Sequence, residues 1–312
     1  MPHWPDIPYP RFAETGKALH MWSQIVGKLR IRLTPWLNHS WHATFYVNGR
    51  GLTSSLMHGE TKSFETQFDF RDHALHIDCT DGSRRTIALK TMSVADFHAQ
   101  FLAALGSLGA PTNLHHAPNE IPDPVPFKDQ TDTLTYDPDA AHDFWQALVA
   151  IDAVFGEFRT GFLGKSTLPH LFWGSFDFAV TRFSGRPAPT HPGGFPALPD
   201  EITREAYSHE VHSAGFWPGG NGADEAMFYA YAYPTPDGFA DATVAPDAAF
   251  FDQNLGEFLL PYDAVRTASS PRETLLAFLQ STYDAAADLG KWDRAALDCS
   301  LGSPGAPRPV TN

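Results

Sequence analysis

The sequence is poor in cysteine and lacks long apolar runs. Its two cysteines, Cys79 and Cys299, lie far apart and form no CxxC or Cys/His zinc spacing, so we expect reduced thiols rather than a disulfide framework. No stretch is apolar enough to span a bilayer, and the opening residues MPHWPDIPYP contain neither a basic nor an apolar signal region. These absences favour a cytoplasmic protein that makes no membrane contact.

Basic residues are also scarce. The chain has 22 Lys and Arg against 36 Asp and Glu, a net charge of −14, and no Lys/Arg-rich run. Nucleic acids and anionic membranes are bound through basic patches, so we expect neither as a partner. The chain also lacks the GxGxxG and GxxxxGK[ST] motifs, which argues against a nucleotide-binding, doubly wound sheet.

Aromatic residues and histidines, by contrast, are abundant. Aromatic residues make up 13% of the 312-residue chain, with 8 Trp, and there are 15 His. Aromatic side chains bury large areas and line ligand pockets, while neutral histidine is both a common metal ligand and a common core residue. The composition therefore favours a globular fold with a site for a small molecule.

The same order of local signals occurs twice along the chain. Residues 15–28 and 137–165 each predict a helix that ends at Gly-Lys, the second with Asp137 as its N-cap. Each is followed by an alternating segment that ends at Gly-Arg, WHATFYVNGR (41–50) and FDFAVTRFSGR (176–186). We expect these two segments to be equivalent strands.

The later signals match as well. SFETQFDF (63–70) and SHEVHSAGF (208–216) predict strands, and an alternating run that breaks at Asp-Gly follows each of them. Each half then closes with a strand and a helix. These helices begin at Ser93 and Ser270, and each serine has an acidic residue three positions later, which is the capping-box pattern.

These signals predict an α+β fold with an internal duplication, because strands and helices are segregated within each half. We expect two helix–antiparallel sheet–helix units, residues 1–110 and 137–299, related by an approximate two-fold rotation. A Pro-rich connector, residues 111–136, joins them and is expected to be ordered against both halves. Residues 300–312 are expected to form a flexible tail.

Several motifs carry a resemblance to a known family. LHMWSQIVGK, PWLNHSWH, FWGSFDFAVTRFSGR and SHEVHSAGFWPGG resemble an uncharacterised family of bacterial proteins whose shared domain has no assigned function. The resemblance extends over nearly the whole chain. It implies no activity, cofactor or catalytic residue, so the chemistry has to be inferred from the residues themselves.

The densest group of possible metal ligands lies in SHEVHSAGFWPGG. On a strand, Glu210 and His212 share one face and His209 lies on the other. His170 and Asp177, from PHLFWGSFDF, are the best ligands from another strand. A mononuclear site with two histidines and one carboxylate would suit Fe, Mn or Zn.

A simpler interpretation explains the same residues without a metal. Glu210 would pair with an arginine such as Arg182 or Arg186, and the histidines would be hydrogen-bonded packing residues. His39 and His42 in PWLNHSWH are similarly explained by stacking on tryptophan, although a site there stays open. The sequence does not decide between these interpretations.

Two functional hypotheses follow, and both use an aromatic-lined cleft in the second half. The first is an enzyme that acts on a small molecule with a bound metal; the second is a non-catalytic protein that binds a small ligand in the same cleft. The expected substrate-binding residues are Trp173, Arg186, Phe216 and Trp217. No nucleophile motif is present, since WGSFD lacks the second glycine of G-x-S-x-G. Substrate, reaction class and oligomeric state stay open.

Overall fold

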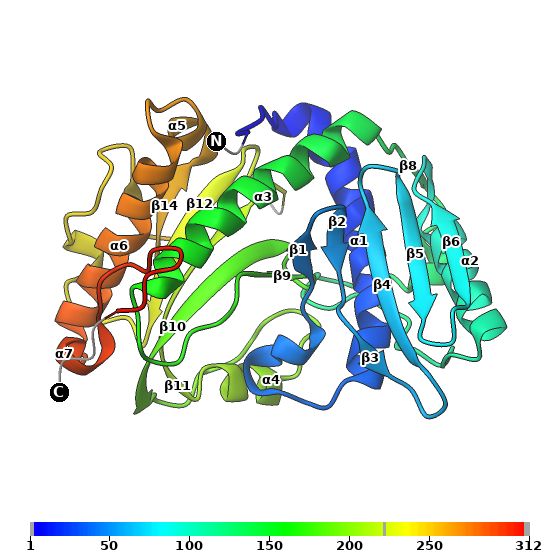
Figure 1. The fold of residues 1–312 in the computed structure, drawn as a ribbon, viewed down its shortest axis with the longest axis horizontal. Coiled ribbons are helices and arrows are strands. Elements are labelled where there is room, and N and C mark those ends of the chain that lie inside the picture. The colour runs from blue at the N-terminus through cyan, green and yellow to red at the C-terminus, as the bar shows by residue number, and fades with distance from the viewer. Residues whose placement is uncertain (1–2, 221–222, 309–312) are drawn as a thin grey trace.

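The computed structural model describes residues 3–220 and 223–308 of the chain. It is an α+β fold in which two six-stranded antiparallel sheets lie beside each other and long helices pack against them (Figure 1). The predicted α+β class is therefore confirmed. None of the helices described is long and apolar enough to cross a membrane.

The first sheet is an antiparallel meander in the order β1-β2-β4-β5-β6, with β3 paired to β4. Its strands are β1 Tyr46–Asn48, β2 Gly51–Thr53, β3 Met57–His58, β4 Ser63–Asp69, β5 Ala74–Cys79 and β6 Arg84–Ala88. β5 and β6 form the hairpin predicted from the Asp-Gly signal, with Gly82 at a φ of 84°.

The second sheet has the order β13-β14-β12-β11-β10-β9. Its strands are β9 His170–Phe172, β10 Asp177–Pro187, β11 His209–Trp217, β12 Met227–Tyr233, β13 Phe250–Asp252 and β14 Glu257–Pro261. A small additional sheet pairs β7 Met92–Ser93 with β8 Thr133–Leu134.

Four long helices cover the sheets. They are α1 Tyr9–Leu33, α2 Val94–Leu108, α3 Pro138–Thr160 and α6 Pro271–Leu289. In Figure 1, α3 and α6 lie in front of the second sheet, whereas α1 and α2 lie behind the first. The short helices are α4 Asp200–Ala206, α5 Tyr262–Arg266 and α7 Arg294–Leu297, with 3₁₀ segments η1 Asn38–Ala43, η2 Phe127–Asp129 and η3 Phe239–Asp241.

Two predicted caps form as expected. The Asp137 side chain accepts hydrogen bonds from the first backbone N–H groups of α3, and the Ser93 hydroxyl accepts one from the backbone of Asp96 in α2. Ser270, by contrast, makes no side-chain cap at α6. The predicted matching capping boxes are therefore present in the first half only.

The predicted end of the first helix at Gly27-Lys28 is wrong. α1 continues to Leu33, and Gly27 lies in its interior. A Cβ at this position would collide with the indole of Trp173. Gly27 is thus explained by close packing against the second half rather than by a helix end.

The predicted strand over 41–50 is also largely wrong. Residues 38–43 form η1, in which His39 and Ser40 have positive φ, and β1 covers only Tyr46–Asn48. Within this segment the His42 ring nitrogen Nδ1 accepts a hydrogen bond from the backbone N–H of Leu37. Local side-chain bonding thus replaces the expected extended backbone.

The two halves share one hydrophobic core. Phe45, just before β1, makes two backbone hydrogen bonds with Leu171 in β9, of 3.0 and 2.8 Å, so the two sheets meet at these strands. Trp145 of α3 donates a hydrogen bond to the backbone oxygen of Asn48 in the first sheet. Buried residues from both halves form a single cluster.

The segment 111–136 contacts both halves. The backbone of Asn119 is held by the Gln24 amide of α1, and the Asn119 side chain donates to the backbone oxygen of Ala197 in the second half. Phe127 is fully buried. The structure describes residues 300–308 of the expected tail. Within them, Gly302 and Arg308 form hydrogen bonds with Thr160. Residues 309–312 lie outside the described part.

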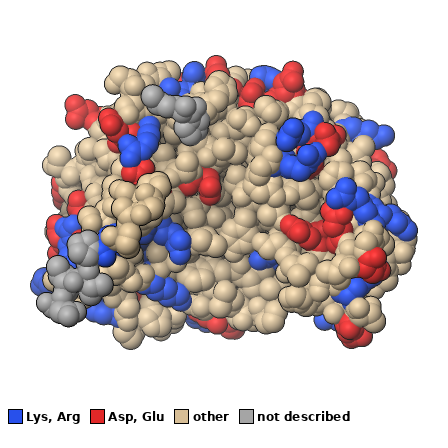
Figure 2. All heavy atoms as spheres, viewed as in Figure 1, with Lys and Arg blue, Asp and Glu red and all other residues tan. Residues whose placement is uncertain are grey.

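Charged residues on the surface are mixed. On the face shown in Figure 2, Lys and Arg alternate with Asp and Glu around wide uncharged areas. Among the described residues, Arg272 forms an ion pair with Glu157, and Arg294 forms ion pairs with three aspartates. This face presents no extended basic patch among the residues described.

Candidate functional site

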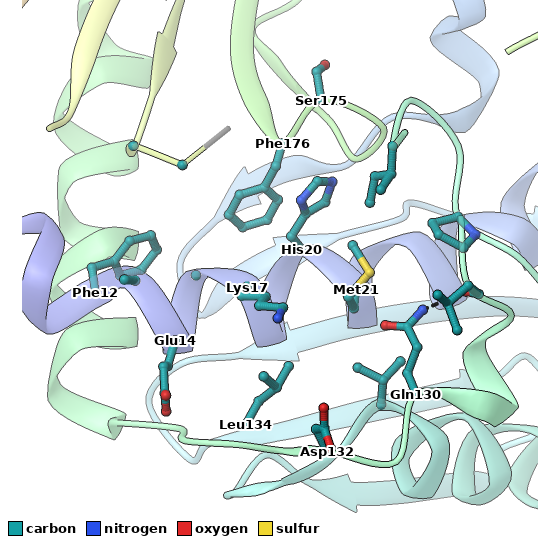
Figure 3. Close-up of a pocket in the computed structure, with 18 of the residues that line it drawn as sticks. Phe12, Glu14, Lys17, His20, Met21, Gln130, Asp132, Leu134, Ser175 and Phe176 are labelled. Atoms are coloured by element: carbon teal, nitrogen blue, oxygen red, sulfur yellow. Dashed lines mark hydrogen bonds between the residues drawn. The ribbon is translucent and has the colours of Figure 1, made fainter. Parts of the chain in front are cut away.

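Two cavities are large enough for a small molecule. The larger, of about 750 Å³, lies between α1, the segment 118–134 and the turn at 175–176 (Figure 3). Its wall alternates apolar side chains such as Phe12 and Met21 with single charged groups such as Glu14 and Lys17. Glu14 is exposed and accepts a hydrogen bond from the backbone of Thr135. The Glu14 carboxylate is therefore already engaged by the protein backbone.

The second cavity, of about 410 Å³, lies on the face of the second sheet opposite α3 and α6, where the short helix α4 and the segment η1 help to line it. Strand alternation creates this face. On β12, Phe228 and Ala230 point toward the core, while Tyr229, Tyr231 and Tyr233 line the cavity. Three tyrosines at every second position thus form an aromatic floor.

Asp177, the first residue of β10, lies at one end of this floor. It is 4% exposed, and its carboxylate accepts hydrogen bonds from the Ser175 and Tyr229 hydroxyls. Burial raises its pKa, while these two hydrogen bonds act in the opposite direction. Asp177 is therefore a buried acid that faces a cavity without a basic partner among the described residues.

Gly215 allows Tyr229 to reach Asp177. The two residues sit on β12 and β10, with β11 between them, and Tyr229 lies directly opposite Gly215 in the register. A Cβ at Gly215 would collide with the Tyr229 phenol. The ring thus lies across β11 because residue 215 has no side chain.

Glu257, the first residue of β14, lies next to Tyr231 on the same floor. One of its carboxylate oxygens, Oε2, is buried and has no hydrogen-bond partner among the described residues. Burial raises the pKa of Glu257 to about 8, and the nearby Asp177 and Asp252 act in the same direction. An unpartnered buried oxygen that faces a cavity is available to a hydrogen-bond donor that enters the cavity.

A third acid, Glu120, comes from the segment between the halves. It has a φ of 60° and packs against Gly174, where a Cβ would collide with its carboxylate. Burial and Asp177 raise its pKa to about 7, and Lys28 opposes that shift. Lys28 is itself buried, over the Trp173 ring at 5.0 Å, and burial lowers its pKa to about 8.

Further aromatic groups complete the walls. The Tyr207 and Tyr231 hydroxyls are hydrogen-bonded at 2.7 Å, and burial raises the pKa of Tyr207 to about 12. Trp217 packs on Tyr229 with ring centroids 4.7 Å apart. His191, from the Pro- and Gly-rich loop 188–199, stacks on Tyr207 at 4.7 Å. The cavity is thus acidic and aromatic, and no Lys or Arg among the described residues lines it.

The comparison with known families places the chain. The model of a family of unknown function, DUF5996, matches residues 4–299. The chain belongs to the DUF5996 family. No curated protein and no solved structure matches it.

In this DUF5996 protein the predicted metal ligands are not brought together. His170 pairs with Ala179 and His209 with Pro187, eight residues along β10 (179 to 187), or roughly 25 Å at the rise of a strand. The expected common pocket wall of His170, His209 and Glu210 is therefore wrong. The register of three strands, which alternation alone does not fix, decides this outcome.

Each of these residues has local partners instead. Glu210 pairs with Arg186 at 2.6 Å, as the simpler interpretation expects, and His209 is exposed. His212 is buried on the helix-covered face, 3.2 Å from the Thr282 hydroxyl, and burial lowers its pKa to about 3. His170 donates from Nδ1 to the backbone of Leu168.

The described residues contain one group with metal-ligand spacing. It consists of Asp69, Asp72 and His76 in the first sheet. Arg50 forms ion pairs with both aspartates, so part of their negative charge is already neutralised. Arg50 thus has a structural role.

Only one of the four expected substrate-binding residues of the DUF5996 protein, Trp217, lines the acidic cavity. Asp177, one of the expected metal ligands, also lines it. Trp173 is buried beneath it and donates to the backbone of Ala43, and Phe216 packs on the helix-covered face against Tyr262. Arg186 is held by Glu210 and the end of α6.

Sequence patterns missed Glu120 and Glu257 and left a site at His39 open. His39 lines the cavity from the first half and hydrogen-bonds to the backbone of Ala206; burial lowers its pKa to about 4. Glu120 and Glu257 carry no motif. The alternating tyrosines in AMFYAYAY were the one available signal, because residues at every second position of a strand share a face.

Proposed function

We propose that this protein binds a small organic cation in the acidic, aromatic cavity of the second sheet. The observation that carries the proposal is the buried carboxylate oxygen of Glu257, which has no partner among the described residues and faces a cavity where Asp177 is also buried. Buried acids are stable as anions only when a positive charge lies close to them. No Lys or Arg of the described residues lines this cavity, and burial keeps His39 neutral by lowering its pKa to about 4, so a ligand is the natural source of that charge.

The aromatic walls support the same ligand class. Tyr229, Tyr231 and Trp217 present ring faces and edges to the cavity. Aromatic rings attract ammonium groups, and the attraction is strongest where water is excluded. An ammonium group among these rings and carboxylates would therefore be bound more favourably than a neutral molecule of the same shape.

This proposal follows the ligand-binding hypothesis rather than the metal-enzyme hypothesis. A mononuclear metal needs three or more ligands on one point, and the residues expected to supply them lie on different faces and at different ends of the sheet. The cavity itself satisfies the requirement for a concave, mostly apolar pocket with a few convergent polar groups.

We expect purified protein to bind n-pentylamine at neutral pH. Isothermal titration calorimetry should detect binding, and Asp177→Asn should weaken it by about tenfold or more because one buried charge is removed. Glu14→Gln, which removes a carboxylate from the larger cavity, is the matched control and should leave the affinity unchanged. Absence of binding to the wild type, or equal losses in both variants, would contradict the proposal.

We also propose that the chain contains a duplicated α+β unit, with 1–110 and 137–299 as the two copies and 111–136 as the connector. Both sheets contain a five-stranded antiparallel meander in sequence order, β1-β2-β4-β5-β6 and β9-β10-β11-β12-β14. They meet at their first strands, near Phe45 and Leu171. This arrangement supports an equivalence between β1 and β9 in place of the one we expected between 41–48 and 176–184.

A further inference from the structure

The three acids of the cavity differ in how their charge is balanced. Glu120 lies near Lys28, which favours its charged form. Asp177 is held by two hydroxyl groups, which stabilise a carboxylate without neutralising it. Glu257 has, among the described residues, neither a basic neighbour nor a partner for its Oε2 atom. Two of the three carboxyl groups are therefore left without a positive charge.

These two acids stand at separate places on the floor. Asp177 begins β10 and Glu257 begins β14, and these strands are three positions apart in the sheet order β14-β12-β11-β10. Three strand spacings separate the backbones by about 14 Å across the sheet. The register places Phe258 level with Val180, so Glu257 also lies four residues, about 13 Å, along the strands from Asp177. The two backbone positions are thus roughly 19 Å apart, and both side chains line the cavity. One ammonium group does not contact both carboxylates at such a separation.

The surface between the two acids is aromatic. Tyr229 reaches Asp177, and Tyr231, two residues further along β12, lies beside Glu257. The two phenol rings are nearly parallel, with centroids 6.1 Å apart. Such a surface accommodates a methylene chain, because apolar groups pack on ring faces without leaving polar groups unsatisfied.

We propose that the ligand of this cavity is a molecule with two cationic centres, an α,ω-diamine, with one ammonium group at Asp177 and the other at Glu257. This inference rests on the proposed function and specifies its ligand class. The methylene chain of the diamine would lie along Tyr229 and Tyr231. A monoamine of the same length would satisfy only one of the two acids.

Binding at the Glu257 end should release a proton. The groups that face Glu257 are acids and phenols: Asp252 on β13, Asp177 on β10, Tyr231 on β12 and Tyr207 after α4. With no cation nearby, burial keeps the pKa of Glu257 at about 8, so the carboxyl group holds a proton at pH 7. An ammonium group beside it favours the carboxylate, and the proton leaves to the solvent.

The test compares cadaverine with n-pentylamine, which has the same five-carbon chain and one charge fewer. Calorimetry on the full chain at pH 7, in two buffers of different ionisation enthalpy, measures both affinities and the protons released. We expect cadaverine to bind about tenfold more tightly or better, a gap of about 1.4 kcal/mol, and to release a proton. In Glu257→Gln the ratio of the two affinities should approach one, with no proton release.

The outcomes separate this inference from the proposed function. If neither amine binds, both fail. If pentylamine binds as tightly as cadaverine, the two-cation ligand is overturned while the proposed function stands. If cadaverine is preferred and Glu257→Gln keeps the wild-type ratio, Glu257 is not the second anchor. Glu14→Gln should keep the wild-type ratio, and thermal melts establish that each variant is folded.

Discussion

Single residues without a side chain shape this site. At position 215 the absence of a Cβ lets the Tyr229 phenol cross β11 and bond to Asp177. Few other side chains would fit, because the ring occupies the space directly above the backbone. The hydrogen bond from Tyr229 in turn fixes the Asp177 carboxylate toward the cavity. Gly215 in the middle of β11 thus permits a hydrogen bond between side chains of the two flanking strands, β12 and β10.

We expect Gly215→Ala to damage both stability and binding. The new methyl group displaces the Tyr229 ring, and such overpacking costs about 1–3 kcal/mol of the free energy of unfolding. Amine affinity should fall with it, because Asp177 loses a hydrogen bond. Chemical denaturation and calorimetry measure the two effects.

A matched control for this variant is Gly156→Ala. Gly156 lies within α3, and an alanine methyl group there would meet no neighbouring atom within 4 Å, so the substitution should stabilise the protein by about 0.5–1 kcal/mol. If Gly215→Ala behaves like the control, Tyr229 is not held against residue 215.

At the scale of elements, α1 connects the two halves. Its Gly27 face receives the Trp173 indole from the second half, and its Gln24 and Lys28 side chains hold Asn119 of the connecting segment. The helix thereby positions Glu120, the next residue, against Gly174 at the cavity. A helix from the first half thus helps to build a site in the second.

Gly27→Ala should loosen this contact. A methyl group at position 27 collides with Trp173, so we expect the free energy of unfolding to fall by about 1–3 kcal/mol despite the higher helix propensity of alanine. The change in Trp173 packing should also shift the tryptophan fluorescence. A variant as stable as the wild type, or more stable in the manner of Gly156→Ala, would show that the helix and the indole are not in close contact.

For the whole molecule, opposing buried groups determine how stability depends on pH. Burial lowers the pKa of His20 and His39 to about 4 and of His170 and His212 to about 3. These histidines are neutral in the folded state, so the stability they confer is present above the ordinary value of 6.5 and is lost as the pH falls. Glu120 and Glu257 have raised pKa values, about 7 and about 8, so their contribution is present at low pH and is lost as the pH rises to 8.

We therefore expect maximal stability between about pH 6 and 7, with losses on both sides. As the pH falls below this range, each histidine lowers the free energy of unfolding by up to about 1.4 kcal/mol per pH unit. The loss from four histidines is larger than the gain from the two acids. Above it the acids dominate. Denaturant unfolding across pH 4 to 8 measures the curve, and Glu257→Gln should flatten its decline between about pH 6.5 and 8. A decline that is unchanged in this variant would mean that Glu257 titrates normally.

Sequence patterns determined the features that depend on near neighbours. Alternation and Asp-Gly turns predicted the antiparallel strands β4, β5, β11 and β14, and cap residues predicted the starts of α2 and α3. The sequence also indicated Trp217 as a substrate-binding residue and Asp177 as a metal ligand, and both residues line the acidic cavity. Strand periodicity fixes which side chains share a face, and the polarity of those side chains indicates which face is exposed to solvent.

Tertiary structure alone decided which distant groups meet. His39, Glu120 and Glu257 come from three separate parts of the chain, and no local pattern links them. The expected metal ligands, which come from two consecutive strands, were separated because strand register and pleat placed them on different faces and at different ends of the sheet. The need for glycine at position 27 is likewise explained only by the Trp173 indole that packs against it. Local periodicity sets the direction of a side chain, whereas its neighbours depend on how the whole core packs.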